Sequence, residues 1–518
     1  MPHIPSILTH FSPELILLLG ILVVLIYDLW VRGREGLQAG LAIVTTAVAL
    51  VATLVLWLTM PGSHSVFEAC GPGAKAAACR PGAFVSDTFT HFFRVLGLMA
   101  TLLVLISGQT FMRGRTAFKG EFYALVLSAV LAMNLMAGAN DLIVIALAIE
   151  FLSITSYILT AFLRHDPLSI EGGLKYFLYG SITSAVMLFG MSYLLGVGGT
   201  TSVPALAAIA RNPELVQVQG YGSIMLPALI MVLAGIAFKI ALVPFHQWSP
   251  DAYQGAPTPV TAFLSVGPKA AGFAVLIRLF VGSFSSPMIS PGWLGTMGLL
   301  CFLTMVIGNV AALTQPNVKR MMAYSSIAQA GYMLLGVVSL GGKTIAGLDS
   351  LGAVLFFILT YVFTNLGAFA VIIAVEQATG SAELETYRGL MRRSPLLAVS
   401  LVIFFLSLVG VPPFSGFVAK FAVFGAAVTG GHAPLAVVGV LTGVVSVVYY
   451  FGVLREMFFG AATEGQPGAI RVGMGTTFVV LVALFMTLVM GLWPEPFISL
   501  SNAVAHSILP VIKAAAGQ

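Results

Sequence analysis

The chain has 518 residues, of which 58% are hydrophobic and only 8% are charged, whereas a soluble domain has about 25% charged residues. This composition excludes an ordinary water-soluble enzyme and leaves no stretch for a soluble catalytic domain. The net charge of +5 does not indicate nucleic-acid binding, because the 24 Lys and Arg residues form no run longer than pairs such as Arg392-Arg393.

Apolar stretches of about 20 residues, the length that crosses a bilayer as a helix, follow one another along the chain. The first is too long for a signal peptide and follows no basic segment, so we expect it to be retained as a helix. The predicted fold class is all-α, a polytopic membrane protein with about fourteen spans, the twelfth of them broken. The predicted spans are residues 13–31, 37–60, 86–110, 121–138, 142–163, 173–197, 223–246, 259–281, 293–314, 321–340, 351–375, 395–430, 434–454 and 474–493.

Basic residues outside the spans are distributed unequally between the two sides of the predicted bundle. One side has thirteen, namely Arg32, Arg34, Arg113, Arg115, Lys119, Arg164, Lys319, Arg320, Arg388, Arg392, Arg393, Arg455 and Arg471. The other side has five, namely Lys75, Arg80, Arg211, Lys343 and Lys513. The positive-inside rule therefore places the first side in the cytoplasm and both termini outside.

Two of the three cysteines, Cys70 and Cys79, share the loop 61–85 on the predicted outer side. They form either a disulfide or two free thiols, because the sequence does not show whether their Cβ atoms meet. The chain has no cysteine motif for an iron–sulfur cluster or haem, and no motif for nucleotide or zinc binding. We therefore expect no cofactor and no metal on this chain.

Three lysines, Lys239, Lys269 and Lys420, lie among apolar residues near the centres of predicted spans. A lysine at a helix centre costs roughly 2.5 to 3.5 kcal/mol on insertion scales, so water or other helices must compensate each one. Lys175 is nearer the end of a span. Arg94 and Arg278 are close enough to span ends for their side chains to reach the interface.

Glu150 is the only acidic residue predicted deep inside a span, and it is therefore the candidate partner for one of these lysines. Burial disfavours the charged form of both residues, whereas pairing favours it, so making or breaking a pair would change how tightly the lysine holds its proton. Two interpretations are open: a pathway for protons, and a static buried ion pair.

A proline accompanies each of the three lysines: Pro244 follows Lys239, Pro268 directly precedes Lys269, and Pro412-Pro413 precede Lys420. Helical hydrogen bonding must fail near each proline, and freed carbonyls at membrane depth favour a hydrated path of the kind that transporters contain. Alternatively, each proline only kinks a packing helix.

His246, Trp248 and Asp251 follow the seventh predicted span on its cytoplasmic side. A histidine at a helix end can pass protons between water and a buried lysine. A structural turn with a tryptophan at the membrane interface would explain the same residues.

Five segments together resemble a known family: IEFLSITSYIL, EGGLKYFLYG, AFKIALVPFHQWSPDAYQGAPTPVTAFLSVGPKAAGF, NVKRMMAYSSIAQAGYMLLG and VGVPPFSGFVAKF. They are similar to the antiporter-like subunits of proton-pumping NADH:quinone oxidoreductase, respiratory complex I, over roughly residues 13–495. The resemblance implies a single transmembrane domain over residues 1–518 with two inverted five-helix repeats, at 121–281 and 293–455. It also implies an energy-transducing inner membrane, with both termini on the periplasmic side.

By the same resemblance, Glu150 pairs with Lys239, Lys269 carries protons centrally and Lys420 releases them. Lys175 matches a further family lysine. The implied partners are other membrane subunits, including neighbouring antiporter-like and small helical subunits. NAD, FMN, iron–sulfur clusters and quinone are expected in partner subunits.

Two other functions remain open on the sequence. The chain could belong to a multi-subunit cation/proton antiporter, which shares the fold and the lysines. It could also be an inert scaffold, in which apolar residues would replace the buried ionisable groups without loss of proton movement.

Overall fold

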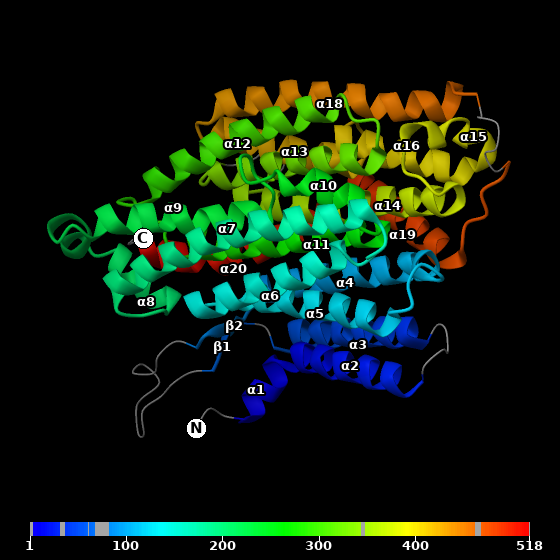
Figure 1. Ribbon diagram of the computed structural model, residues 1–518. Coiled ribbons are helices and arrows are strands. Elements are labelled where there is room, and N and C mark those ends of the chain that lie inside the picture. The colour runs from blue at the N-terminus through cyan, green and yellow to red at the C-terminus, as the bar shows by residue number, and fades with distance from the viewer. Residues whose placement is uncertain are drawn as a thin grey trace.

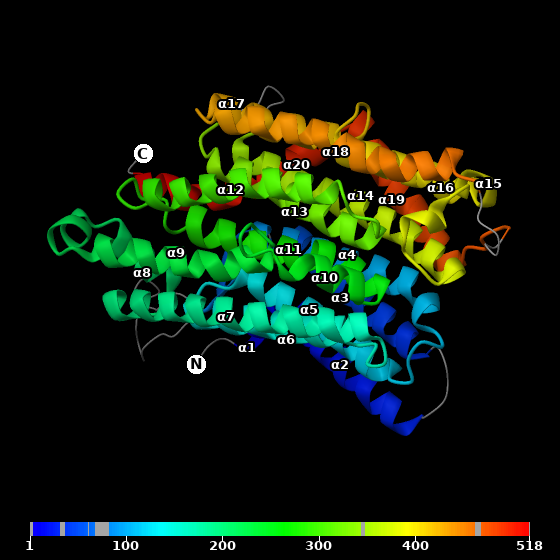
Figure 2. The same cartoon turned by 45° about the horizontal axis from the view of Figure 1, so that its top comes forward.

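The computed structural model describes residues 4–31, 37–60, 62–67, 82–342, 348–461 and 468–516. Cys70 and Cys79, with the question of their disulfide, lie outside these described residues. Nearly all of the described residues are helical, and the long helices run side by side in one bundle (Figures 1 and 2). The predicted all-α class is therefore confirmed, apart from one short hairpin of β1 (His64–Val66) and β2 (Phe84–Ser86).

Within the described ranges, thirteen helices are long and apolar enough to cross a membrane. They are α2 (Ser12–Trp30), α3 (Leu37–Thr59), α4 (Thr88–Met112), α5 (Lys119–Gly138), α6 (Leu142–Thr160), α7 (Pro167–Gly198), α9 (Tyr221–Lys239), α11 (Thr258–Leu276) with its π-helical extension η3 (Ile277–Val281), α12 (Ser290–Ala312), α13 (Val318–Val338), α14 (Ser350–Thr379), α18 (Ala433–Phe459) and α19 (Met474–Leu492). The remaining predicted span consists of two shorter apolar helices, α16 (Pro395–Val409) and α17 (Ser415–Thr429). These helices confirm the predicted spans, including the broken one.

Several shorter or more polar elements connect or flank the spans. They are α1 (Ile4–His10), α8 (Val203–Ala210), η2 (Glu214–Val218), α10 (Trp248–Gly255), η4 (Leu384–Tyr387), α15 (Leu390–Arg393) and α20 (Glu495–Ala516). The sequence did not lead us to expect α20, because its polar residues dilute the apolar pattern on which the spans were predicted. This helix packs along α14 and α4.

Polar caps explain where several spanning helices begin. The helices α4, α6, α7, α13 and α14 each follow an Asp or Asn whose side chain accepts a hydrogen bond from a backbone N–H of the first turn. Glycines in the left-handed conformation end α7 and α14, at Gly199 and Gly380. Residues at the ends of these helices therefore determine where the helices begin and end.

The centre of the bundle is formed by α11, α13 and α14, which are buried along nearly their whole length. By contrast, α2, α3, α7 and α18 bury only one face. Figures 1 and 2 show α2 and α3 along one edge of the bundle and α18 along the opposite one. Side chains on α11 and α13 are therefore shielded from lipid on every side.

Two of the three predicted breaks are present. α9 ends at Lys239 and α10 starts at Trp248, with a cis bond before Pro244 between them. α16 and α17 are separated by residues 410–414, which contain the cis Pro412-Pro413 bond. The third proline does not break its helix, because α11 continues through Pro268, in agreement with the alternative of a proline within a packing helix. Proline removes one backbone donor there, but the packing on all sides of α11 keeps the helix intact.

Arg94 and Arg278, which we expected near span ends, both form ion pairs with acidic residues at the starts of spanning helices. Arg94 is completely buried, and its Nε and Nη2 atoms each donate to a carboxylate oxygen of Glu14 at 2.8 Å. Glu14 is 1% exposed and lies in the first turn of α2, so it is a buried acid at the start of a span, unlike Glu150 within α6. Arg278 makes a two-pronged ion pair with Asp87, at 2.9 and 3.0 Å. Burial opposes ionisation of Asp87, but Arg278 and Thr90 outweigh it and hold the pKa of Asp87 below its ordinary value.

Candidate functional site

Lys239 is the last residue of α9 and is only 1% exposed. Its Nζ atom donates a hydrogen bond of 2.8 Å to the Ser153 hydroxyl on α6. The rings of Tyr176 and Phe238 both lie 5.9 Å from the ammonium, within the range of a cation–π contact. The groups in direct contact with the Lys239 ammonium are thus neutral.

Glu150 lies one helical turn before Ser153 on α6. The side chains of Glu150 and Lys239 form no ion pair within 4.0 Å among the described residues. The Oε1 atom of Glu150 is buried and has no hydrogen-bond partner in the part of the chain that the structure describes. The structure therefore places the predicted partners near each other without direct contact.

Lys269 projects from α11, is 4% exposed, and donates a hydrogen bond to the Ser326 hydroxyl on α13. The same hydroxyl accepts a bond of 2.8 Å from Tyr361 on α14 and lies 3.3 Å from the Tyr253 hydroxyl on α10. Ser326 thus joins groups from four helices around the central lysine. The break before α10 matters here, because α10 carries Tyr253 into this cluster.

Lys420 is 5% exposed and lies on α17, just beyond the second break. Its Nζ atom donates to the carbonyl oxygens of Leu408 at 2.7 Å and Val409 at 3.0 Å. These are terminal carbonyls of α16, which lack partners within their own helix and carry the negative end of its dipole. The break therefore creates an acceptor site for the ammonium.

The three lysines are connected through two central helices. A Cβ atom at Gly272 on α11 would lie 3.6 Å from Cγ of Lys239, so the stem of Lys239 packs one turn away from Lys269. On α13, Gln329 follows Ser326 by three residues and donates to the Leu408 carbonyl at 3.0 Å, the oxygen that also binds Lys420. The structure thus brings the predicted Lys239, Lys269 and Lys420 into one connected interior.

Lys175 is placed differently, with its side chain 39% exposed. Its ammonium forms ion pairs with Asp251 on α10 at 2.8 Å and with Glu171 at 2.6 Å. Asp251 also binds Arg320 on α13. Lys175 and Arg320 therefore hold α10 between α7 and α13, and Lys175 does not join the three buried lysines.

His246 lies half-buried between α9 and α10, and its Nδ1 atom has no hydrogen-bond partner among the described residues. The alternative of an interfacial tryptophan beside it was wrong, because Trp248 is 1% exposed. The Trp248 ring stacks on Tyr176 at 3.8 Å and donates to the Phe238 carbonyl at 3.1 Å. His246 thus lies two residues before Trp248, which belongs to the buried aromatic cluster beside Lys239.

The fold and these buried lysines define a multi-pass membrane protein with ionisable groups at membrane depth, a type of site that pumps and transporters carry. Residues 139–446 match the family described as NADH:quinone oxidoreductase/Mrp antiporter, TM. The chain is also 41% identical, over 443 residues, to NADH-quinone oxidoreductase subunit N of Desulfitobacterium hafniense, covering 84% of this chain and 88% of that protein. The chain therefore belongs to the NADH:quinone oxidoreductase/Mrp antiporter family.

Solved structures agree with this assignment. A chain of respiratory complex I from Thermus thermophilus is 30% identical, with a TM-score of 0.74 and coverage of 94% of this chain and 98% of that one. A chain of the Mrp complex from Dietzia sp. shares the fold at 22% identity, with a TM-score of 0.80 and coverage of 98% and 99%. Within the family, the opening SPELILLLGILVVLIYDL and lysine rather than glutamate at 420 favour similarity to subunit N over subunit M, and the relative named above confirms this.

Proposed function

We propose that the chain is the proton-translocating membrane subunit of an NADH:quinone oxidoreductase. Partner subunits, with their NAD, FMN, iron–sulfur clusters and quinone, oxidise NADH and reduce quinone, while this chain moves protons without redox chemistry of its own. The names of its relatives support this activity. The observation that carries the proposal is the connected set of Lys239, Lys269 and Lys420, each buried and each bound by neutral oxygen atoms.

Neutral acceptors suit a lysine that must gain and lose protons. Removing the proton from an ammonium bound by a carboxylate leaves an unpaired buried anion, which is strongly unfavourable. Removing it from an ammonium bound by a serine hydroxyl or a peptide carbonyl leaves only neutral groups. Each of the three lysines therefore has a stable neighbourhood in both protonation states.

We assign the start of proton transfer to the pair of Glu150 and Lys239. A shift at a neighbouring subunit changes the separation of Glu150 and Lys239, and so changes how tightly Lys239 holds its proton. The proton passes to Lys269 and then to Lys420, from which it leaves on the outer side. Transfer of one charge against 100 mV costs about 2.3 kcal/mol, which electron transfer in the partner subunits supplies.

Other sequence expectations fit this proposal. His246, between water and the aromatic cluster over Lys239, supplies protons from the cytoplasmic side, and Lys175 holds α10 in place through Asp251. The ranges 121–281 and 293–455 each contain five spans with the break in the fourth, which supports two inverted repeats. Multi-subunit complexes among the structural relatives support neighbouring membrane subunits. We place the chain in an inner membrane with both termini outside, as the distribution of basic residues predicts.

Replacement of Lys239 tests the proposal in the native membrane. We expect Lys239→Ala and Lys239→Met, which retains most of the side-chain length, to lower NADH-driven proton uptake and quinone reduction together while native gels show an assembled complex. Lys119→Ala, at the start of α5, is the matched control. Unchanged proton uptake in both Lys239 variants would contradict the proposal and support an inert scaffold.

A cation/proton antiporter subunit is the second candidate, since the family description includes Mrp antiporters and the Dietzia chain has the same fold. The two functions differ in their energy source and in their need for sodium. Proton uptake driven by NADH in sodium-free membranes supports the oxidoreductase. Proton movement that needs a sodium gradient and ignores NADH supports the antiporter.

A further inference from the structure

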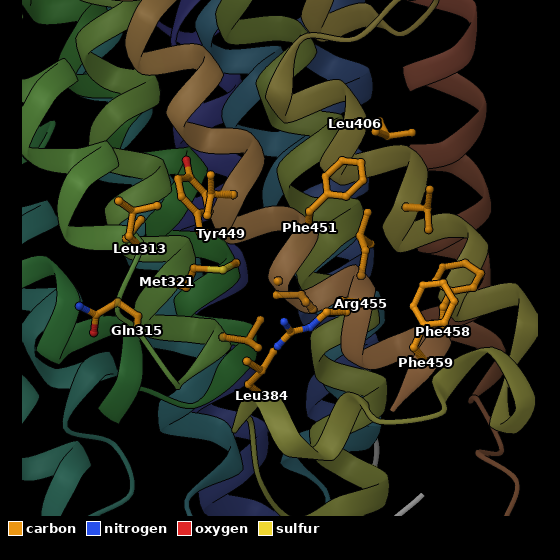
Figure 3. Close-up of a pocket in the computed structure, with 17 residues that line it drawn as sticks. Leu313, Gln315, Met321, Leu384, Leu406, Tyr449, Phe451, Arg455, Phe458 and Phe459 are labelled. Atoms are coloured by element: carbon orange, nitrogen blue, oxygen red, sulfur yellow. The ribbon is translucent and has the colours of Figure 1, made fainter. Parts of the chain in front are cut away.

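A groove of about 810 Å³ opens on the surface of the bundle between α12, α13, α16 and α18 (Figure 3). Its walls are mostly apolar, with Leu313, Leu406, Phe451 and Phe458 among the labelled side chains, and with Gln315, Tyr449 and Arg455 as polar members. Phe451 and Phe458 are 50% and 42% exposed. None of the steps proposed above uses this groove.

The length of the groove matches one leaflet of a bilayer. On α18 its wall runs from Val448 to Phe459, a rise of about 16 Å at about 1.5 Å per residue. One leaflet contributes half of a hydrocarbon core that is about 30 Å thick. On α16 the wall ends at Leu406, shortly before the break at Gly410. A partner helix would cross both leaflets, whereas acyl chains of a lipid would end where the groove ends.

Positive charge lies near the end of the groove that the distribution of basic residues places on the cytoplasmic side. Arg455, in the last turns of α18, has a side chain that is 74% exposed, and Figure 3 shows its guanidinium extending toward Leu384. Its neighbour Glu456 contacts Arg455 at 3.3 Å but also accepts a 3.0 Å bond from Nε of Arg388. Arg388 also contacts Glu385 at 3.7 Å, whereas Arg455 has Glu456 as its one acidic partner among the described residues. Since Glu456 is shared, Arg455 keeps donors for an anion.

We propose that this groove binds one anionic diacyl phospholipid, with its phosphate on Arg455 and its acyl chains between α16 and α18. Basic pockets between spanning helices are a known setting for anionic headgroups, because arginine presents several donors to a phosphate. The floor of the groove reaches the interior: Tyr449 donates to Asn309 at 3.2 Å, and Asn309 donates to the hydroxyl of Tyr332, whose ring lies 4.6 Å from Nζ of Lys420. The bound lipid therefore supports the helix packing around the terminal lysine.

Two substitutions separate the acyl part of the site from its headgroup part. A Cβ atom at Gly452, in the groove wall, meets nothing within 4 Å, so Gly452→Leu fills the groove without a clash. Gly443→Leu is the matched control, because Gly443 lies on the same helix, also has open space and does not line the groove. Arg455→Gln removes the cation at the surface, and Arg471→Gln is its control.

The test uses the intact complex, stripped of lipid in detergent and then incubated with phosphatidylglycerol or phosphatidylcholine, and counts retained lipid by native mass spectrometry. We expect Gly452→Leu to lose one bound lipid, and Arg455→Gln to lower phosphatidylglycerol retention about fivefold with little effect on phosphatidylcholine. Equal retention in the Arg455→Gln variant and the wild type would overturn the proposal, as would crosslinking of a Phe451→Cys variant to a partner subunit along the groove. Lipid counts do not depend on proton transport, so this proposal and the proposed function fail separately.

Discussion

The ammonium of Lys239 lies 2.8 Å from the hydroxyl of Ser153, one helical turn from Glu150 on the same helix. The neutral hydroxyl of Ser153 therefore accepts the hydrogen bond from Lys239, whereas we expected the carboxylate of Glu150 to pair with it. No direct ion pair joins Glu150 and Lys239 among the described residues, so under the proposed function a small movement of α6 or α9 changes their interaction without breaking one.

Ser153→Ala tests this hydrogen bond. A bond to a charged group contributes about 1.5 to 3 kcal/mol, and its loss leaves a buried ammonium donor unsatisfied. We expect NADH-driven proton uptake to fall about tenfold, with Ser153→Thr close to wild type. Ser128→Ala is the control, because that hydroxyl bonds only to its own helix at Ala124. Equal uptake in Ser153→Ala and Ser128→Ala would show that the hydroxyl has no part in transfer.

Ser326→Ala removes the acceptor that Lys269, Tyr253 and Tyr361 share. Three side chains lose a partner together, so we expect a larger fall in proton uptake than for Ser153→Ala, by roughly a further factor of ten. The comparison is Ser339→Ala, at the end of the same helix, where the hydroxyl bonds to the Leu335 carbonyl at 2.7 Å. The two rates are measured in membranes with matched complex content, and similar values would refute the role given to Ser326.

Gly416→Ala should damage the acceptor site of Lys420. A Cβ atom at Gly416 would overlap the Ser407 carbonyl oxygen, so α17 would have to move away from the end of α16. We expect lower proton uptake and a lower melting temperature of the purified complex. Gly425→Ala, on the same helix with nothing within 4 Å of the new Cβ, should be neutral or slightly stabilising. A Gly416→Ala complex as stable and active as Gly425→Ala would contradict the close packing.

Glu14→Gln should destabilise the chain, because it leaves Arg94 charged and buried without its carboxylate. Breaking a buried pair costs about 3 to 5 kcal/mol, whereas replacing both partners by apolar residues is often neutral. We therefore expect a reduced melting temperature for Glu14→Gln and recovery of most of it in the double variant Glu14→Leu/Arg94→Met. If the double variant melts no higher than Glu14→Gln, the pair has a role beyond charge compensation.

The spans and the burial of the three lysines could be predicted because hydropathy and the cost of a buried charge are local properties of the sequence. The partners could not be predicted. The hydroxyls of Ser153, Thr155 and Ser156 all bond to carbonyls of their own helix. Only the fold brings Lys239 to Ser153, so the sequence does not distinguish Ser153 from the other two. The carbonyls that bind Lys420 belong to the backbone and have no sequence signature. For α13, the polar residues Ser325, Ser326 and Gln329 in an otherwise apolar span were the available signal.

The hydroxyl of Ser326 has two lone pairs and one proton. It accepts from Lys269 and Tyr361, so its own proton is available to Tyr253. A charged lysine can only donate, but once it has lost its proton the amine nitrogen can accept. Under the proposed function, a transfer through Lys269 leaves the hydroxyls around Ser326 oriented for the previous proton. The Ser326 hydroxyl must then rotate before Lys269 can pass the next proton, so the orientation of these hydroxyls becomes part of the transfer cycle.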